Sequence, residues 1–356
     1  MENGENLSSF YTLDNAQEKS ISHVPQNFVI PNMHRPNLET KYANLAVVDM
    51  AALKNGSASR SRVIQEIRDS CRRLGFFQVV NHGVSESVLE EALSVASKFF
   101  DLPTKEKVNL MSNDVYKPVR YCTSIKDGVD KVQFWRVFLK HYANPLKDWI
   151  HMWPENPSDY REKMGRYCQE VKKVGLELIS TIIESLEINP SYLTKKLEDG
   201  MQVIAVNCYP PCPQPDIALG LPPHSDYSCL TILYQSCEGL QIMDFEDKTW
   251  KAIPHIPGAL QVHVGDHFEV LSNGLYKSVV HRATLNRDKT RISITSLFSL
   301  GMDDKMETAK ELVDDQNPKK YRESSFKDFL DFLATNDISE GKSFIDILKI
   351  NNDNHY

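Results

Sequence analysis

The most constraining feature of this 356-residue chain is a series of seven short strand-like runs that fills residues 201–300. The runs are rich in β-branched and aromatic residues, and Gly, Pro, Asn and Asp separate them, with no helical pattern between them. In chain order they read MQVIAVNCY, SCLTILYQ, GLQIMD, TWKAI, ALQVHVGD, KSVVHRATL and RISITSLFSL. Such a series predicts an antiparallel barrel of two sheets rather than a parallel α/β sheet.

Helical patterns flank this region on both sides. Apolar residues recur at intervals of three and four, and Ser85 is a candidate N-cap of the second helix. The expected helices span 59–75, 85–103, 158–188 and 324–336, and further strands are expected at 45–50 and 76–80. In the last helix, Phe329, Leu330 and Leu333 share the face that would cover the barrel. The fold class is therefore predicted as α+β, with a β-barrel core between helices.

The chain divides into four segments on these patterns. The first is polar, with Pro25, Pro31 and Pro36 spaced too closely for a long helix, and reads as an extended arm. The expected segments are the arm (1–40), a mixed helical region that packs on the barrel (41–195), the barrel (196–305) and a C-terminal helical cover (306–356).

The composition excludes several classes of function. Asp and Glu outnumber Lys and Arg by 48 to 41, and no basic block gathers in one segment, so we expect no nucleic-acid partner. No run approaches the roughly 18 consecutive apolar residues of a membrane span, so we expect a water-soluble protein. The seven cysteines are odd in number and form no CxxC pair, which favours a reducing compartment. The acidic N-terminal residues contain no apolar stretch, and we expect a cytoplasmic protein.

Two histidines of the strand region stand in a pattern typical of a metal site. His224 lies two residues before Asp226, and side chains two apart in an extended chain point the same way. His281 lies in a later run and can add a third ligand from a neighbouring strand. Two histidines, one carboxylate and open positions on the metal are the arrangement of non-haem Fe(II) oxygenases. An HxD pair alone is common by chance, and a strand histidine is more often structural, so the pattern needs further support.

Arg291 and Ser293 give this support. In RISITSLF, strand alternation puts Arg291, Ser293, Thr295 and Leu297 on one face. An arginine that points into a barrel needs an anionic partner, and its fork-shaped guanidinium suits a carboxylate. The alternative is a surface ion pair of Arg291 with nearby acids.

The metal needs a co-substrate that chelates it, and the arginine needs a carboxylate at a distance from the metal. One molecule, a 2-oxo dicarboxylic acid, can supply both groups. The favoured co-substrate is therefore 2-oxoglutarate. Its C1 carboxylate and keto oxygen would occupy two open metal positions, its far carboxylate would pair with Arg291 and Ser293, and dioxygen would take the last position.

Longer motifs resemble a known family. The runs NCYPPCPQPDIALGLPPHSDYSCLTIL, IPGALQVHVGDHFEVLSNGLYKSVVHRATLN and RISITSLF, with GFFQVVNHGV near the N-terminus, are similar to plant 2-oxoglutarate- and Fe(II)-dependent dioxygenases such as flavanone 3-hydroxylase, flavonol synthase and anthocyanidin synthase. The resemblance implies a double-stranded β-helix, or jelly roll, flanked by helices. It also implies that His224, Asp226 and His281 bind iron and that Arg291 and Ser293 hold 2-oxoglutarate.

The resemblance extends to further residues of the site. Asn207 and Tyr209, in NCYPPCP, would make further contacts with 2-oxoglutarate, although a strand end before a proline-rich turn is an alternative role. Phe138 and Lys140 align with positions that line the organic substrate site, and Leu297 is a third candidate because it shares the inward face of Arg291. Each could equally be a packing residue or, for the lysine, a solvated one.

The expected function is hydroxylation or desaturation of a small, largely apolar plant metabolite, such as a flavonoid, phenolic, terpenoid or hormone. 2-Oxoglutarate would be converted to succinate and CO2, with ascorbate as reductant, in a monomeric enzyme. Two alternatives stay open: an ascorbate-dependent enzyme like 1-aminocyclopropane-1-carboxylate oxidase, and a jelly-roll binding protein without catalytic activity.

Overall fold

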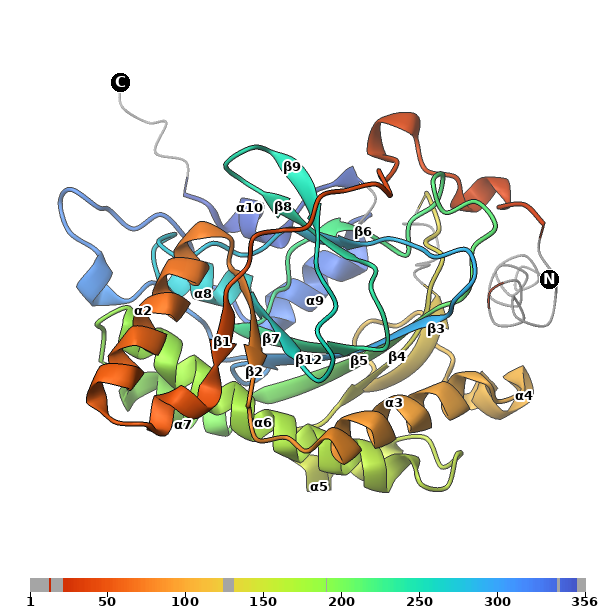
Figure 1. The fold of residues 1–356 in the computed structure, drawn as a ribbon, viewed down its shortest axis with the longest axis horizontal. Helices are drawn as coiled ribbons and strands as arrows, with labels where there is room; N and C mark the ends of the chain where they lie inside the picture. The colour runs from red at the N-terminus through yellow and green to blue at the C-terminus, as the bar shows by residue number, and fades with distance from the viewer. Residues whose placement is uncertain (1–12, 14–21, 124–130, 190, 338–339, 351–356) are drawn as a thin grey trace.

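Two β-sheets form the centre of the molecule, and the larger has eight strands (Figure 1). The computed structural model describes residues 13, 22–123, 131–189, 191–337 and 340–350. In spatial order the larger sheet contains β1 (Val47–Asp49), β2 (Phe76–Val80), β10 (Leu260–Val264), β7 (Leu230–Gln235), β12 (Arg291–Ser299), β5 (Met201–Tyr209), β4 (Val137–Tyr142) and β3 (Val119–Thr123). The pair β1 and β2 is parallel, and the other neighbours are antiparallel.

The smaller sheet has four antiparallel strands. They are, in spatial order, β6 (Leu221–His224), β11 (His281–Ala283), β8 (Leu240–Asp244) and β9 (Thr249–Ala252). Side chains of both sheets line one cavity, so the sheets face each other across it. The predicted antiparallel barrel of two sheets, a jelly roll with flanking helices, is confirmed.

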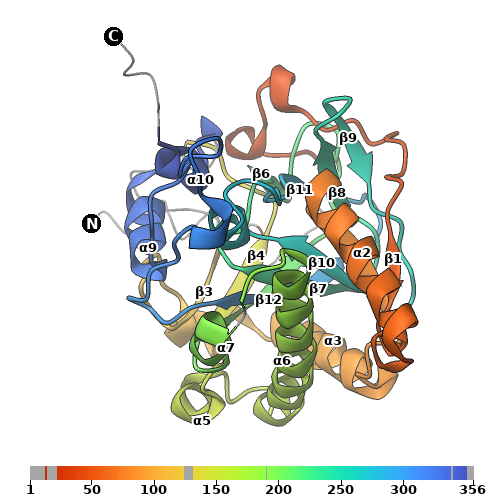
Figure 2. The same cartoon turned by 90° about the vertical axis from the view of Figure 1, so that its left-hand side faces the viewer.

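Helices cover the outer face of the larger sheet, and a C-terminal pair lies on the other side (Figure 2). The longer helices are α2 (Ser57–Arg73), α3 (Glu86–Phe100), α6 (Tyr160–Ser185), α7 (Ser191–Glu198) and α9 (Phe326–Thr335). Short helices are α4 (Thr104–Lys107), α5 (Leu146–Trp149), α8 (Asp266–Leu271) and α10 (Phe344–Leu348), with single turns at η1 (Gln26–Phe28), η2 (Asn32–His34), η3 (Met50–Lys54), η4 (Val108–Leu110), η5 (Ile150–Met152) and η6 (Lys310–Leu312).

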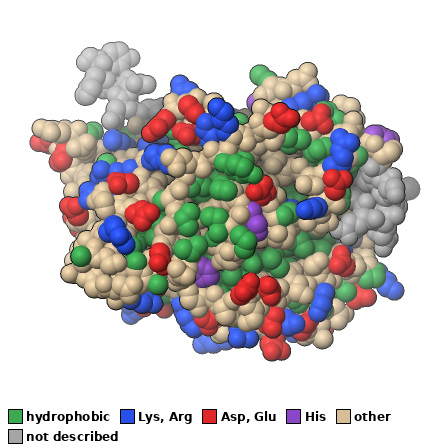
Figure 3. Space-filling model, viewed as in Figure 1, with side chains coloured by type: hydrophobic (Ala, Val, Ile, Leu, Met, Phe, Trp, Pro, Cys, Tyr) green, Lys and Arg blue, Asp and Glu red, His purple; other side chains and the backbone are tan. Residues whose placement is uncertain are grey.

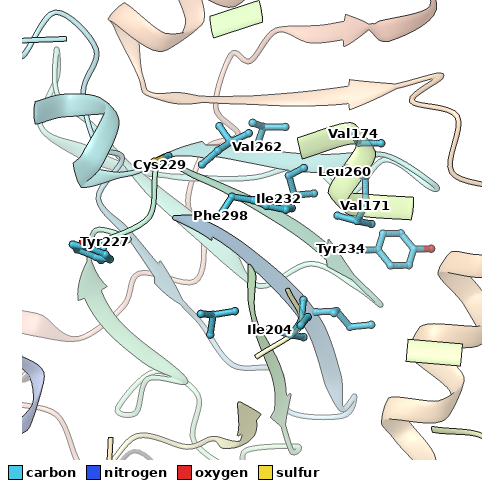
Figure 4. Close-up of a cluster of buried hydrophobic side chains, with 14 of the residues drawn as sticks. Val171, Val174, Ile204, Tyr227, Cys229, Ile232, Tyr234, Leu260, Val262 and Phe298 are labelled. Atoms are coloured by element: carbon cyan, nitrogen blue, oxygen red, sulfur yellow. The ribbon is translucent and has the colours of Figure 1, made fainter. Parts of the chain in front are cut away.

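The core between α6 and the larger sheet explains why β12 presents two unlike faces. Val171 and Val174 of α6 lie near Leu260 and Phe298 of the sheet (Figure 4). A Cβ added to Gly175 would stand 2.7 Å from the Phe298 ring, so only glycine lets the helix approach this closely. The alternate residues of β12 are consequently free to face the cavity.

Most predicted elements agree with the structure, and three details differ. A short helix, α8, interrupts the strand series between β10 and β11, where no helix was expected. Strand β6 was missed because LPPH contains two prolines, which are disfavoured in strands. Ser85 is the N-cap residue of α3, but its side chain makes no capping hydrogen bond and lies 3.1 Å from the Ser87 hydroxyl instead.

The predicted N-terminal arm is described only in part. Residues 1–12 and 14–21 lie outside the described residues. In the described part, Phe28 is buried and packs edge-on against the Trp135 ring at 5.3 Å, and the Ile30 amide donates to the Ile217 carbonyl. This part of the arm is therefore attached to the barrel.

Candidate active site

The smaller sheet brings the two predicted histidines face to face. His224 is the last residue of β6 and pairs directly with His281, the first residue of β11. Their ring centroids are 4.2 Å apart. Asp226 follows β6, and its Oδ1 lies 3.7 Å from His224 Nε2 and 3.8 Å from His281 Nε2. These contacts are too long for hydrogen bonds, and the three ligand atoms lie within 4.8 Å of one another.

Backbone contacts orient both imidazoles. His224 Nδ1 lies 2.8 Å from the Pro222 carbonyl oxygen, and His281 Nδ1 lies 3.2 Å from that of Val279. A carbonyl only accepts, so Nδ1 carries the proton and donates it in each ring. The unprotonated Nε2 atoms are left facing Asp226, which is the orientation that a metal-binding histidine needs.

The protonation states of the cluster also suit a cation. Burial lowers the pKa of His224 to about 3 and that of His281 to about 4, so both rings are neutral at neutral pH. Burial by itself raises the pKa of Asp226, but the surrounding His281, His263 and His224 outweigh it and hold this pKa below its usual range. An ionised carboxylate and two neutral imidazoles are the forms in which these groups bind metals.

A third histidine, His263 of β10, stands behind the cluster and was missed from the sequence. It is fully buried, and its Nδ1 lies 3.5 Å from Asp226 Oδ2. Its ring also packs against His281, with centroids 4.7 Å apart. The available signal was the alternation of polar Gln261 and His263 within an otherwise apolar run.

Arg291, the first residue of β12, lies in the same cavity and is buried. Its Nη2 and Nε donate to Gln235 Oε1 at 2.8 and 3.2 Å, and its guanidinium stacks on the Tyr209 ring at 5.0 Å. Nη1 is buried and has no hydrogen-bond partner among the described residues. A Cβ at Gly239 would stand 2.7 Å from Arg291 Cδ, so this glycine leaves room for the side chain. The surface ion pair considered for Arg291 is wrong.

The predicted co-substrate residues lie next to this arginine. Strand β12 pairs with β5 so that Arg291 is opposite Tyr209 and Ser293 is opposite Asn207. Asn207 Nδ2 lies 3.4 Å from the Ser293 hydroxyl, and Asn207 Oδ1 accepts from Arg136 Nη1 at 3.0 Å. All four predicted residues therefore line one wall of the cavity.

The cavity has a volume of about 240 Å³, and it also contains the three predicted substrate residues, Phe138, Lys140 and Leu297. Helix α9 closes it with Phe326, Phe329, Leu330 and Leu333.

On the face seen in Figure 3, hydrophobic side chains gather near the middle, and charged ones are more frequent toward the edge. Among the described residues, every helix is too short or too polar to span a bilayer.

Comparison with protein families agrees with this architecture. Residues 200–299 match the 2OG-Fe(II) oxygenase superfamily. Residues 45–156 match a second family, described as the N-terminal region of non-haem dioxygenase in morphine synthesis. The first match contains all predicted metal and co-substrate residues, and the second contains most of strands β1 to β4 and helices α2 and α3.

Individual relatives extend over most of the chain. Flavanone 3-dioxygenase 3 of Oryza sativa subsp. japonica is 46% identical over 90% of this chain and 98% of its own length. 2-Oxoglutarate-dependent dioxygenase 21, chloroplastic, of the same organism is 50% identical over 86% and 91%. A crystal structure of JOX2 in complex with 2OG, Fe and JA is 30% identical, with a TM-score of 0.80 over 91% of this chain and 93% of that one. The chain therefore belongs to the 2OG-Fe(II) oxygenase superfamily and is a dioxygenase that depends on Fe(II) and 2-oxoglutarate.

Proposed function

We propose that His224, Asp226 and His281 hold the Fe(II) ion. The observation that carries the proposal is the convergence of two Nε2 atoms and one carboxylate oxygen at distances too long for hydrogen bonds. Neutral imidazoles and an ionised carboxylate are suitable ligands for Fe(II), and three protein ligands leave positions open for other molecules. His263 Nδ1 lies 3.5 Å from the second oxygen of Asp226, Oδ2.

Arg291 and Ser293 are proposed to bind the far carboxylate of 2-oxoglutarate. The free Nη1 of Arg291 needs an acceptor, and a buried guanidinium with an open donor is stabilised by a carboxylate. Tyr209 positions the guanidinium by stacking on it, and Asn207 positions the Ser293 hydroxyl. Gln235 fixes the remaining donors, so the free one keeps its direction.

When bound, Fe(II) supplies the oxidation chemistry of the family, in which 2-oxoglutarate is converted to succinate and CO2 while a small organic molecule is oxidised. Phe138, Lys140 and Leu297 are proposed to contact that molecule, and α9 excludes water from it. We further propose a plant metabolite as substrate, ascorbate as reductant, and a cytoplasmic, monomeric enzyme without nucleic-acid or membrane partners. The four-segment division at residues 40, 195 and 305 is proposed as its domain organisation.

Anaerobic reconstitution tests the metal site. The wild-type protein is expected to retain about one Fe(II) per chain and to form succinate when oxygen and a substrate are added. His224→Ala is expected to lose both properties, because two ligands cannot hold the ion against dialysis. Bound iron is measured spectroscopically after dialysis, independently of turnover.

His255→Ala is the matched control, because His255 is exposed and does not line the cavity. It is expected to keep the iron and the activity of the wild type. Normal turnover in His224→Ala would refute the assignment of the metal ligands.

A further inference from the structure

A cationic wall, formed by Arg120, Arg136 and Lys140, lines part of the same cavity. Arg120 in β3 and Lys140 in β4 are directly paired across the two strands. The guanidinium groups of Arg120 and Arg136 lie 5.1 and 4.4 Å from the centroid of the Phe138 ring. Phe138 therefore holds the two arginines near each other on the wall that the predicted substrate residues share.

The positive charges of this wall outnumber the carboxylates that line the cavity. Among the described residues that line it, Asp226 is the one carboxylate, and the histidine cluster surrounds it. Lys140 donates to the carbonyl oxygen of Val115 at 2.8 Å, and Arg120 has only a long contact, 3.4 Å, with that of Asn113. The buried Nε of Arg120 has no hydrogen-bond partner among the described residues. Buried cations that face only neutral groups are costly.

The environment of Lys140 lowers the pKa of its ammonium group. Burial, together with the neighbouring Arg120, lowers the pKa of Lys140 to about 7, although Cys122 and the exposed Asp114 act in the opposite direction. A bound anion would stabilise the protonated form of Lys140 and remove part of the repulsion between the two cations.

The opposite side of the cavity is apolar. Phe329 of α9 stacks on the Tyr227 ring with centroids 4.8 Å apart, and Leu330 and Leu333 of the same helix also line the space. A ligand that fits both sides has an anionic head for the cationic wall and an apolar body for α9.

We propose that the primary substrate is an amphipathic carboxylic acid, whose carboxylate binds to Arg120, Arg136 and Lys140 and whose apolar body packs against α9. This inference rests on the proposed function and makes it more specific. Arg291 is already directed at 2-oxoglutarate, and Arg136 is held by Asn207. Arg120 and Lys140 thus distinguish a substrate acid from its neutral analogues.

The test compares acids with their neutral amides. The anaerobic protein, loaded with Fe(II) and saturated with 2-oxoglutarate so that Arg291 is occupied, is dialysed against 1-naphthylacetate or 1-naphthylacetamide, and in parallel against 4-phenylbutyrate or 4-phenylbutyramide. At least one acid is expected to bind about tenfold to a hundredfold more tightly than its amide, as for a hydrogen bond between charged groups. Equal binding of acid and amide in both pairs, or no binding of either acid, would overturn the proposal.

Variants of Arg120 and Lys140 test whether these residues cause the preference for the acid. Arg120→Gln and Lys140→Met are each expected to lower the ratio of acid affinity to amide affinity about tenfold, while the affinity for the amide is unchanged. Arg120→Lys is expected to restore part of this ratio. Lys117→Met is the control, because Lys117 is exposed on the same segment and outside the cavity. An unchanged ratio in both Arg120→Gln and Lys140→Met would contradict the proposed wall.

The same samples separate this inference from the proposed function. Iron content and retained 2-oxoglutarate are measured before dialysis, so a protein that binds neither shows that the metal and co-substrate assignments have failed. A protein that retains both but does not distinguish acid from amide shows that only the substrate inference is wrong.

Discussion

The free donor of Arg291 is the single group that most narrowly defines what the cavity binds. Two of the guanidinium nitrogens donate to Gln235, and the third, Nη1, is buried without a hydrogen-bond partner among the described residues. A lysine cannot replace this arrangement, because it offers a point charge rather than a planar fork. On the proposed assignment, the affinity for 2-oxoglutarate therefore depends strongly on Arg291.

Arg291→Gln is expected to raise the KM for 2-oxoglutarate about tenfold to a hundredfold, with bound iron unchanged. Steady-state succinate formation and metal content measure the two effects separately. Arg282→Gln is the control, because Arg282 is also buried and also donates to a glutamine, Gln241, but does not line the cavity. A wild-type KM in Arg291→Gln would contradict the assignment.

His141 makes the stability of the protein depend on pH. It is fully buried, its Nε2 lies 3.0 Å from the Tyr160 hydroxyl, and burial lowers its pKa to about 3. The unfolded chain binds a proton here near pH 6.5 and the folded one does not, so the free energy of unfolding falls as the pH decreases below about 6.5.

His141→Phe is expected to reduce this dependence. Between pH 7 and pH 5 the free energy of unfolding of the wild type should fall by about 2 kcal/mol more than that of the variant, because one histidine contributes this amount over that interval. Urea unfolding at both pH values measures the difference. The same loss in both proteins would show that His141 is protonated in the folded state.

Among the secondary-structure elements, α6 packs closely on β12 at Gly175. Gly175 in α6 allows contact with Phe298, and this contact fixes which face of β12 packs against the helix and which face carries Arg291 and Ser293 toward the cavity. The packing of a helix on the outside of the sheet thus determines the residues inside it.

Gly175→Ala is expected to destabilise the protein by about 1–3 kcal/mol, because the added Cβ forces Phe298 out of place. Gly165→Ala in the same helix is the control. Its Cβ meets only the Ile150 and Leu146 side chains, at 3.4 and 3.6 Å, and alanine favours the helix by about 0.5–1 kcal/mol. Thermal or urea unfolding should separate the two variants, and equal stabilities would contradict this account of the contact.

The sequence predicts elements with a regular pattern and misses those without one. The alternation in RISITSLF correctly places Arg291 and Leu297 inside the barrel, and the helical spacing of apolar residues in 324–336 correctly predicts α9. Strand β6 is missed because its prolines disfavour a strand, and it forms because β11 pairs with it. Arg120 joins the site through the pairing of β3 with β4, a strand pair that the sequence did not predict, and the alternation around His263 does not show that β10 passes close to Asp226.

At the scale of the whole molecule, most cysteine thiols are buried. None of the seven cysteines, all of which lie among the described residues, forms a disulfide; Cys237 is partly exposed, and the other six are buried. Burial raises the pKa of Cys212 to about 11 and that of Cys229 to about 12, so these thiols are unreactive at neutral pH.

A chromogenic thiol reagent at pH 8 is expected to label about one cysteine per native chain and all seven after unfolding in guanidinium. Cys237→Ser should remove the rapid reaction without changing the thermal midpoint. Rapid labelling of several cysteines in the native protein would show that its interior opens on the timescale of the reaction.

On the proposed assignment, the pairing of β6 with β11 completes the set of three iron ligands. His224 and Asp226 are two residues apart in the chain, but His281 reaches them only after the segment from β7 to α8 has been synthesised. A nascent chain that ends before β11 holds two of the three ligands and retains iron weakly. On the proposed ligand set, strong retention of iron is therefore delayed until β11 has joined β6.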